Sequence, residues 1–247
     1  MKNYYFLCGL PRAGNTLFGS LMNQNKNVKV SAYSILPNMF TSILDFKNNL
    51  HFKTFPDHSL VDNVLHNLLN NSYASWNTDN IIDRGPWGHM GCISLIKDII
   101  PNPKFIILYR PILEVMVSMM KIYKPTNIIE YCDHLMTDSI VSDNYFSIQN
   151  LVNQKENYLL INYDDIINSP TETIKKTCKF LNIKYIKPNI NKIEQFSVNG
   201  IYYDDSFLSG KYHELKSGPI SKNKTKIEDW LPQQIIDRYS SWEISFK

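Results

Sequence analysis

Residues 4–24 constrain the fold most tightly, because they join an apolar run, a glycine-containing turn and a helical pattern. Tyr4 to Cys8 is a continuous apolar segment, which is typical of a buried strand in a parallel sheet. Gly9 to Asn15 predicts a turn, and Thr16 to Gln24 has the apolar spacing of a helix. This order brings backbone N–H groups and the positive end of a helix to one point. The segment therefore predicts an anion-binding site.

The turn approaches the Walker A pattern, G-x-x-x-x-G-K-[ST], without completing it. Gly9, Gly14 and Thr16 are in register, but Asn15 stands at the lysine position and Arg12 is the basic residue of the loop. A lysine at that position would reach β- and γ-phosphates, so its absence disfavours nucleoside triphosphate chemistry. On glycine spacing alone, an ordinary strand-to-helix turn explains the segment equally well.

The rest of the chain alternates between strand and helix patterns. Predicted strands are Val28 to Ser31, Ile81 to Ile82, Lys104 to Tyr109 and Tyr158 to Asn162. Predicted helices are Pro37 to Leu50, Leu60 to Ser72, Cys92 to Ile100, Pro111 to Ile122, Asn127 to Asn153, Pro170 to Leu181 and Asp229 to Tyr239. The alternation predicts an α/β fold with a central, mainly parallel sheet flanked by helices on both faces. Without a repeat or linker, we expect one domain over residues 1–247.

Composition narrows the functional classes. The net charge of +3 in 247 residues suits a small anionic ligand and is too weak to indicate nucleic acid. No apolar stretch approaches the ~20 residues of a membrane span, and the N-terminus lacks the apolar region of a signal peptide. The four cysteines are far apart, which predicts free buried thiols and no metal site. We therefore expect a cytoplasmic protein.

A second phosphate-binding candidate follows the strand Lys104 to Tyr109. Arg110 comes directly after this strand, and Ser118 lies eight residues further on the predicted helix. A guanidinium can bind a phosphate through two parallel hydrogen bonds. Ser118 faces the same side only if the helix begins near Pro111. By itself, the pair is explained equally well by a surface arginine and an ordinary helix serine.

The first loop resembles the 5′-phosphosulfate loop of the sulfotransferase family, which binds 3′-phosphoadenylyl sulfate. The resembling residues are Pro11, Arg12, Ala13, Gly14, Asn15, Thr16 and Leu17. Cytosolic members read approximately P-K-S-G-T-T-W, whereas tyrosylprotein and many bacterial members read P-R-S-G-T-T-L. Ala13 and Asn15 depart from both patterns, so backbone amides would bind more of the phosphate. The resemblance implies a P-loop-containing nucleotide hydrolase-like fold with Arg12 beside the sulfuryl group.

Two more segments support the resemblance. Arg110 and Ser118 are similar to the family's site for the 3′-phosphate, although the usual Arg-Asp-Pro is Arg-Pro-Ile here. Residues 159–183 resemble the family's Tyr-Glu-Asp-Leu segment, and Tyr163 matches the tyrosine that lies against the adenine. A core tyrosine is the alternative for Tyr163. The basic residues 222–226 resemble a loop that closes over the cofactor, or form a solvated charge run.

The resemblance implies sulfuryl transfer from 3′-phosphoadenylyl sulfate to a hydroxyl or amine, with adenosine 3′,5′-bisphosphate as the product and no metal. Arg12 would stabilise the charge on the leaving phosphate. The candidate bases are His89 and Asp83, in a loop that resembles the Asp-Lys-x-Pro stretch of bacterial members. Alternatively, Asp83 holds Arg84 and His89 begins the next helix. The glutamate of tyrosylprotein members has no counterpart here.

The acceptor stays open between a small molecule, a sugar and a peptide. Aromatic residues that line an acceptor pocket or belong to the core are Tyr33, Phe40, Phe55, Trp76 and Trp87. Two other functions remain: a P-loop kinase with a displaced basic residue, which requires ATP and Mg²⁺, and a non-catalytic nucleotide-binding protein on the same fold.

Overall fold

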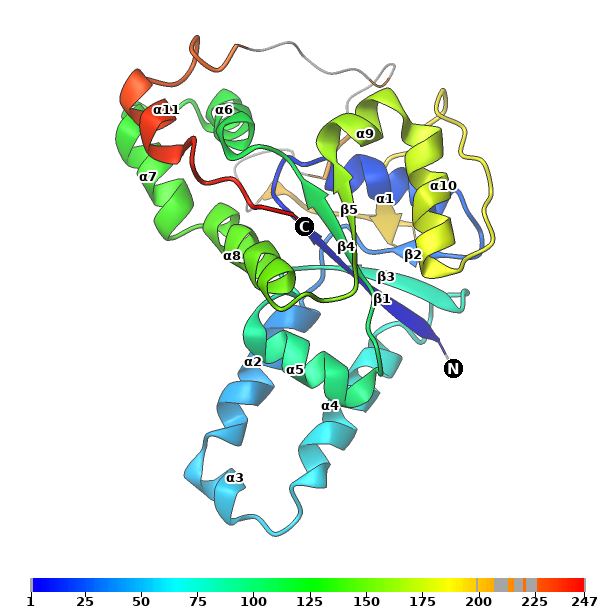
Figure 1. Cartoon of the computed structure of the whole chain (residues 1–247). Coiled ribbons are helices and arrows are strands. Elements are labelled where there is room, and N and C mark those ends of the chain that lie inside the picture. The colour runs from blue at the N-terminus through cyan, green and yellow to red at the C-terminus, as the bar shows by residue number, and fades with distance from the viewer. Residues whose placement is uncertain (1, 199, 207–212, 216–219, 221–225, 247) are drawn as a thin grey trace.

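A five-stranded parallel sheet forms the centre of the protein (Figure 1). The computed structural model describes residues 2–198, 200–206, 213–215, 220 and 226–246. The strands are β1 (Asn3–Gly9), β2 (Lys29–Val30), β3 (Asn80–Arg84), β4 (Phe105–Tyr109) and β5 (Tyr158–Asn162). Their order is β2-β3-β1-β4-β5, and every neighbouring pair is parallel. The predicted α/β class is therefore confirmed.

Helices fill the connections between the strands. They are α1 (Asn15–Asn23), α2 (Leu36–Lys47), α3 (Leu50–Thr54), α4 (Ser59–Ser72), α5 (Met90–Ile99), α6 (Ile112–Tyr123), α7 (Ile128–Thr137), α8 (Ile140–Asn153), α9 (Tyr163–Asn168), α10 (Pro170–Leu181) and α11 (Gln233–Tyr239). A short antiparallel hairpin, β6 (Ser197–Val198) and β7 (Ile201–Tyr202), follows α10.

Two predicted helices are interrupted. The helical region predicted from Asn127 to Asn153 divides into α7 and α8, because Ser139 caps a new helix: its hydroxyl accepts a hydrogen bond from the Val141 amide at 2.9 Å. The helix predicted from Pro37 to Leu50 ends at Lys47, and the Asn49 side chain then caps α3. Both breaks occur at serine or asparagine side chains that compete for helical amides.

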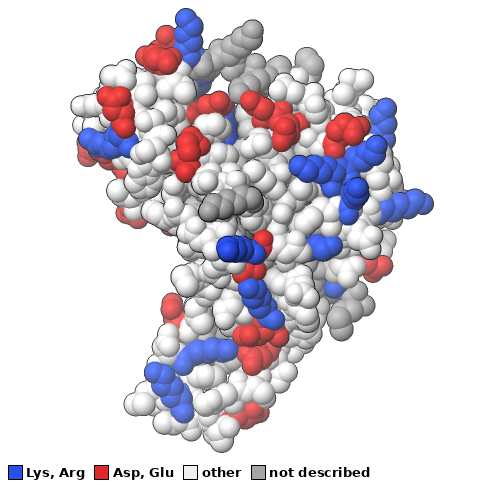
Figure 2. Space-filling view, viewed as in Figure 1, with Lys and Arg blue, Asp and Glu red and all other residues white. Residues whose placement is uncertain are grey.

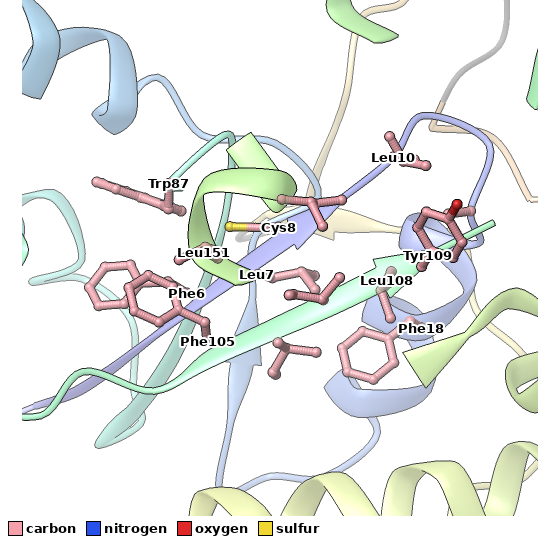
Figure 3. Packing of buried hydrophobic residues seen from close by; sticks show 14 of the residues in the cluster. Phe6, Leu7, Cys8, Leu10, Phe18, Trp87, Phe105, Leu108, Tyr109 and Leu151 are labelled. Atoms are coloured by element: carbon pink, nitrogen blue, oxygen red, sulfur yellow. The ribbon is translucent and has the colours of Figure 1, made fainter. Parts of the chain in front are cut away.

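The core lies around β1, the central strand. The Phe6 ring centroid is 5.0 Å from that of Trp87 and 5.6 Å from that of Phe105. Figure 3 shows these side chains gathered on one side of β1, while Phe18 of α1 packs beside Leu108. All five of these side chains are fully buried, which fits the continuous apolar runs of the sequence. The four cysteines are free and buried, as predicted.

The chain order places a topological switch point between β1 and β4. From β1 the chain continues through α1 toward β2, whereas from β4 it continues toward β5 on the opposite side. Right-handed crossovers then put α1 and α8 on opposite faces of the sheet (Figure 1). Ligands of open α/β sheets bind at the carboxyl ends of two neighbouring strands whose following connections leave in opposite directions. The loops after β1 and β4 are therefore the expected ligand site.

Two features lie away from this edge. Figure 1 shows α2, α3 and α4 as an arm that extends beyond the sheet. Figure 2 shows that acidic and basic side chains are interspersed on the face seen in Figure 1, with a group of basic side chains over α10. Among the described residues, no helix combines the length and apolar character that crossing a membrane needs.

Candidate active site

The loop after β1 has the geometry of an anion cradle. Gly14 caps α1 with a φ of 86°, and Arg12 also has a positive φ, of 65°. A non-glycine residue in this region is strained, and such strain is found mainly at ligand sites. The Ala13 amide donates to the Leu10 carbonyl at 3.1 Å and thereby closes the turn. The loop is consequently held in one shape before any ligand binds.

Asn15 supports this loop from beneath. Its side-chain amide donates to the Leu10 carbonyl at 2.8 Å, and the residue is 9% exposed. Gly9 leaves the space that this side chain occupies, because a Cβ at Gly9 would lie 1.9 Å from Asn15 Oδ1. A Walker A lysine would instead extend toward the phosphates. The departure at position 15 thus replaces a ligand contact with a support for the loop.

Arg12 and the segment after β4 meet across the switch point. Arg12 Nε donates to Ser118 Oγ at 3.1 Å, so Ser118 does face the loop. Arg110 Nη1 donates to the Arg12 carbonyl oxygen at 3.0 Å. The structure therefore brings together three residues that the sequence placed in two separate motifs.

Tyr163 and Glu114 complete the surroundings of Arg110. The Arg110 guanidinium carbon lies 4.2 Å from the centroid of the Tyr163 ring, a cation–π contact. Arg110 Nε donates to Glu114 Oε2 at 3.0 Å. Tyr163 also borders the first loop, because a Cβ at Gly14 would come within 3.3 Å of its ring. Tyr163 is half-buried at the site and is not a core residue.

The electrostatics of this cluster favour an anion. Burial, and next the nearby Arg110 charge, lower the pKa of Arg12 from its ordinary value. A guanidinium nevertheless stays charged in proteins, so two cations lie close together at this loop. An anion with charge at two positions would relieve their repulsion.

Asp83 is located inside the protein. It is completely buried, Trp87 Nε1 donates to its Oδ1 at 2.8 Å, and the Tyr73 hydroxyl donates to its Oδ2. Burial raises the pKa of this carboxyl to about 6, although both hydrogen bonds act in the opposite direction. Arg84 is not its hydrogen-bond partner, contrary to one of the two alternatives considered from the sequence. Asp83 thus anchors the loop that leads to His89.

His89 borders a pocket of about 500 Å³. It is half-buried at the N-cap of α5 and its side chain makes no capping hydrogen bond. Residues of α2, α5 and α8 form the other walls of the pocket, together with Tyr33. The volume is in the range of small-molecule sites. Of the two candidate bases, only His89 opens to this pocket.

The aromatic candidates for an acceptor pocket divide into three groups. Trp76, Trp87 and Phe40 are buried in the core. Phe55 is 46% exposed, on the arm of helices. Tyr33 alone lines the pocket. Pattern could not separate these cases, because aromatic residues serve cores and pockets alike.

Several remaining predicted residues have supporting positions. Pro11 and Ala13 are buried beneath the loop, whereas Thr16 and Leu17 are half-buried in the first turn of α1. Next to Tyr163, Asp165 has a structural role, because it accepts a hydrogen bond from the Asn162 amide at 3.1 Å at the start of α9. Most of the basic stretch lies outside the described residues. Within the described part of the chain, no three His, Cys, Asp or Glu side chains are grouped to hold a metal ion.

Sequence reasoning missed Glu114 and Tyr73. Glu114 had a signal, because a glutamate four residues after an arginine on a helix is an expected ion pair. Tyr73 had none, since its contact with Asp83 joins the end of α4 to the end of β3.

The fold and the loop at its switch point define a P-loop nucleotide hydrolase-like protein. The chain belongs to the sulfotransferase family, whose family model matches residues 5–187. The match covers all four segments with site candidates. No curated protein matches the chain.

Solved structures with a similar fold are sulfotransferases. The sulfotransferase domain of the Synechococcus PCC 7002 olefin synthase is 15% identical, with a TM-score of 0.55 over 97% of this chain and 95% of that chain. Mouse sulfotransferase SULT7A1, complexed with PAP, is 11% identical, with a TM-score of 0.59 over 98% and 82%. A sulfotransferase from Alicyclobacillus acidocaldarius is 13% identical, with a TM-score of 0.54 over 76% and 84%. At these identities, the likeness extends to the fold.

Proposed function

We propose that the protein transfers a sulfuryl group from 3′-phosphoadenylyl sulfate to a hydroxyl or amine of an acceptor. The observation that carries the proposal is the cluster of Arg12, Ser118 and Arg110 at the switch point, where two cations converge from separate loops. Membership of the sulfotransferase family supports the reaction class. The neighbour complexed with PAP, the product of such a donor, supports the choice of donor.

Each residue of the donor side has a distinct role in this proposal. Backbone amides of the loop at Gly14 and the N-terminus of α1 bind the 5′-phosphate. Arg12 stabilises the negative charge that grows on this phosphate as the S–O bond breaks. Arg110 and Ser118 bind the 3′-phosphate, and Tyr163 lies against the adenine. The side chains thus position the donor and neutralise charge, as group transfer requires.

His89 is the proposed general base for the acceptor. It borders the pocket, and histidine is the side chain that most often acts as a general base. Asp83 positions it indirectly, because the buried carboxylate holds Trp87 two residues before His89 in the chain. The acceptor is a small molecule, a sugar or a peptide segment that enters this pocket. The four buried thiols support a cytoplasmic setting.

Thermal unfolding with three ligands tests the proposal. A ligand at ~100 times its Kd adds about 2.7 kcal/mol to the free energy of unfolding. In a domain of this size, this raises the Tm by roughly 5–10 °C. We expect the shift with adenosine 3′,5′-bisphosphate and not with ADP or with ATP plus Mg²⁺. A shift confined to ATP plus Mg²⁺ would indicate a kinase, and bisphosphate binding without turnover on any acceptor would indicate a non-catalytic protein.

A further inference from the structure

The chain after residue 187, where the family match ends, contacts both the helix α1 after the phosphate loop and the wall of the pocket at Tyr33. Phe196 is 3% exposed and packs against α1, where a Cβ at Gly19 would lie 2.9 Å from its ring. Gln24, which follows α1, donates to the carbonyls of Asn189 and Lys192 at 3.2 and 3.1 Å. This segment therefore lies along the helix that begins at the phosphate loop.

Tyr203 extends this segment to the pocket. Its hydroxyl accepts hydrogen bonds from the amides of Ala32 and Tyr33, each at 3.2 Å, and donates to the Tyr33 carbonyl at 2.9 Å. Burial raises the pKa of this hydroxyl, so it keeps the proton that it donates. Arg84 Nη1 donates to the Ala32 carbonyl at 3.3 Å. One hydroxyl thus satisfies three of the four backbone polar groups of Ala32 and Tyr33, and Arg84 satisfies the fourth.

Tyr203 is itself held in place. The His213 ring stacks on it, with centroids 4.4 Å apart and an interplanar angle of 26°. Asp205 accepts hydrogen bonds from the backbone amide of His213 at 2.8 Å, and its other oxygen lies 2.6 Å from His213 Nδ1. Phe196 contacts the Tyr203 ring edge-on at 5.8 Å. The ring has packing partners on two sides, so its hydroxyl has a fixed position.

Ala32 and Tyr33 follow β2 and do not belong to a strand. Backbone groups outside a sheet need other partners, and an unsatisfied buried group is costly. Tyr33 lines the same pocket as His89, and the Arg84 guanidinium lies 5.7 Å from the centroid of its ring. The conformation of this pocket wall therefore depends on a hydroxyl from the far end of the chain.

We infer that Tyr203 is a positioning residue for the acceptor pocket: its hydroxyl fixes the backbone of Ala32 and Tyr33 and thereby the part of the pocket wall that Tyr33 forms. The inference rests on the proposed function for its effect on acceptor binding. The donor cluster has no contact with this hydroxyl among the described interactions of Arg12 and Arg110. Loss of the hydroxyl should thus affect the acceptor and spare the donor.

The test compares Tyr203→Phe with Tyr202→Phe. Tyr202 is the adjacent tyrosine, 68% exposed on β7, so the control removes a hydroxyl that the pocket does not use. Leaving buried amides unpaired should raise the acceptor KM in Tyr203→Phe by about 5- to 30-fold. The Kd of adenosine 3′,5′-bisphosphate should stay within about twofold of wild type. Amide hydrogen exchange of Ala32 and Tyr33, followed in the ligand-free protein, should accelerate at least about tenfold.

These readouts separate the inference from the proposed function. Unchanged exchange at Ala32 and Tyr33, or an unchanged acceptor KM, would overturn the inference. A rise in the bisphosphate Kd as large as the rise in the acceptor KM would also overturn it, because a general loss of structure would then explain the variant. If wild type bound no bisphosphate, the proposed function would fail, while the exchange rates would still decide whether Tyr203 holds this wall.

Discussion

The proposed donor side and the proposed acceptor side of the site are built in different ways. Arg12 lies in the loop after β1, and Arg110 and Tyr163 directly follow β4 and β5. Parallel pairing of these strands therefore brings them to one edge. The acceptor pocket is lined from α2, α5 and α8, and its wall at Tyr33 is held by Tyr203. The donor side thus depends on strand order, whereas the acceptor side depends on contacts between distant segments.

This difference in construction predicts different effects of substitutions on the two sides. In the proposed site, a donor nucleotide would be bound by groups whose positions the sheet fixes, with small adjustments such as the Asn15 support under the loop. The proposed acceptor would be enclosed by helices and by the segment after the family match, which can vary without disturbing the sheet. Changes on the donor side should therefore abolish the chemistry, and changes on the acceptor side should alter substrate choice, loop position and stability.

Arg12→Ala should have the largest effect. Removal of a side chain that stabilises transition-state charge lowers kcat by about 10²- to 10³-fold. The acceptor KM should change little, because Arg12 faces the donor side. Steady-state kinetics on the variant measure both constants. The control is Arg238→Ala. Arg238 lies on α11 and pairs with Asp133 of α7, so this variant should retain wild-type kcat. Comparable kcat values for the two variants would contradict the role of Arg12.

His89→Ala should follow, with a fall in kcat of about 100-fold, since general base catalysis contributes 10²–10⁴. His66→Ala, at an exposed histidine of α4, controls for the loss of an imidazole. The bisphosphate Kd should be unchanged in both. Near-wild-type turnover of His89→Ala would remove His89 from the role of base and leave the pocket without an assigned one.

Gly14→Ala sharpens the comparison on the donor side. An alanine there is strained at a φ of 86° and brings its Cβ within 3.3 Å of Tyr163 and Ile166. Gly200→Ala has a similar φ of 80° but nothing within 4 Å, so it isolates the backbone strain. We expect bisphosphate affinity to fall by about tenfold or more in Gly14→Ala alone. Calorimetric titration gives both values, and an equal loss in the two variants would mean that crowding at Tyr163 is irrelevant.

Asp83→Asn tests the acceptor side through stability. The folded-state pKa of about 6 lies above the ordinary value of 3.8, mainly because of burial. The folded state therefore holds its proton more tightly, and wild type should lose stability as the pH rises from about 4 to about 6. A pKa shift of this size corresponds to a loss of roughly 2–3 kcal/mol in the free energy of unfolding across this pH range. Asp83→Asn should not show this loss. Urea unfolding between pH 4 and 7 measures the two curves, with the exposed Asp143→Asn as the charge control. Parallel curves for wild type and Asp83→Asn would show that the buried carboxyl does not titrate in this window.

The grouping of the proposed donor-side residues could be predicted from the sequence because the information for it is local. Apolar runs identified the strands, and Arg12, Gly14 and Arg110 follow strand ends where a parallel sheet collects its loops. To predict that Ser118 faces Arg12, it was enough to predict where α6 begins. Roles of these residues remain proposals, but their grouping was expected from their spacing.

The acceptor side was predicted poorly because its contacts are non-local. Asp83 was expected to contact Arg84 or an acceptor, and instead accepts hydrogen bonds from Tyr73 and Trp87 within the core. The contact of Tyr203 with Tyr33 joins positions 170 residues apart. No periodicity or motif encodes such pairs, since they arise only when separate elements pack together.

The most direct test of the donor site is the affinity ratio between adenosine 3′,5′-bisphosphate and adenosine 5′-monophosphate, which differ only in the 3′-phosphate. Calorimetric titrations should show wild type preferring the bisphosphate by about 100-fold or more, because a charge-assisted pair contributes about 1.5–3 kcal/mol and Ser118 adds a further bond. Arg110→Ala should reduce this ratio to within about tenfold, with little change for the monophosphate. Equal affinity of wild type for both nucleotides, or a ratio that Arg110→Ala leaves intact, would contradict the assignment of the 3′-phosphate to Arg110 and with it the proposed donor site.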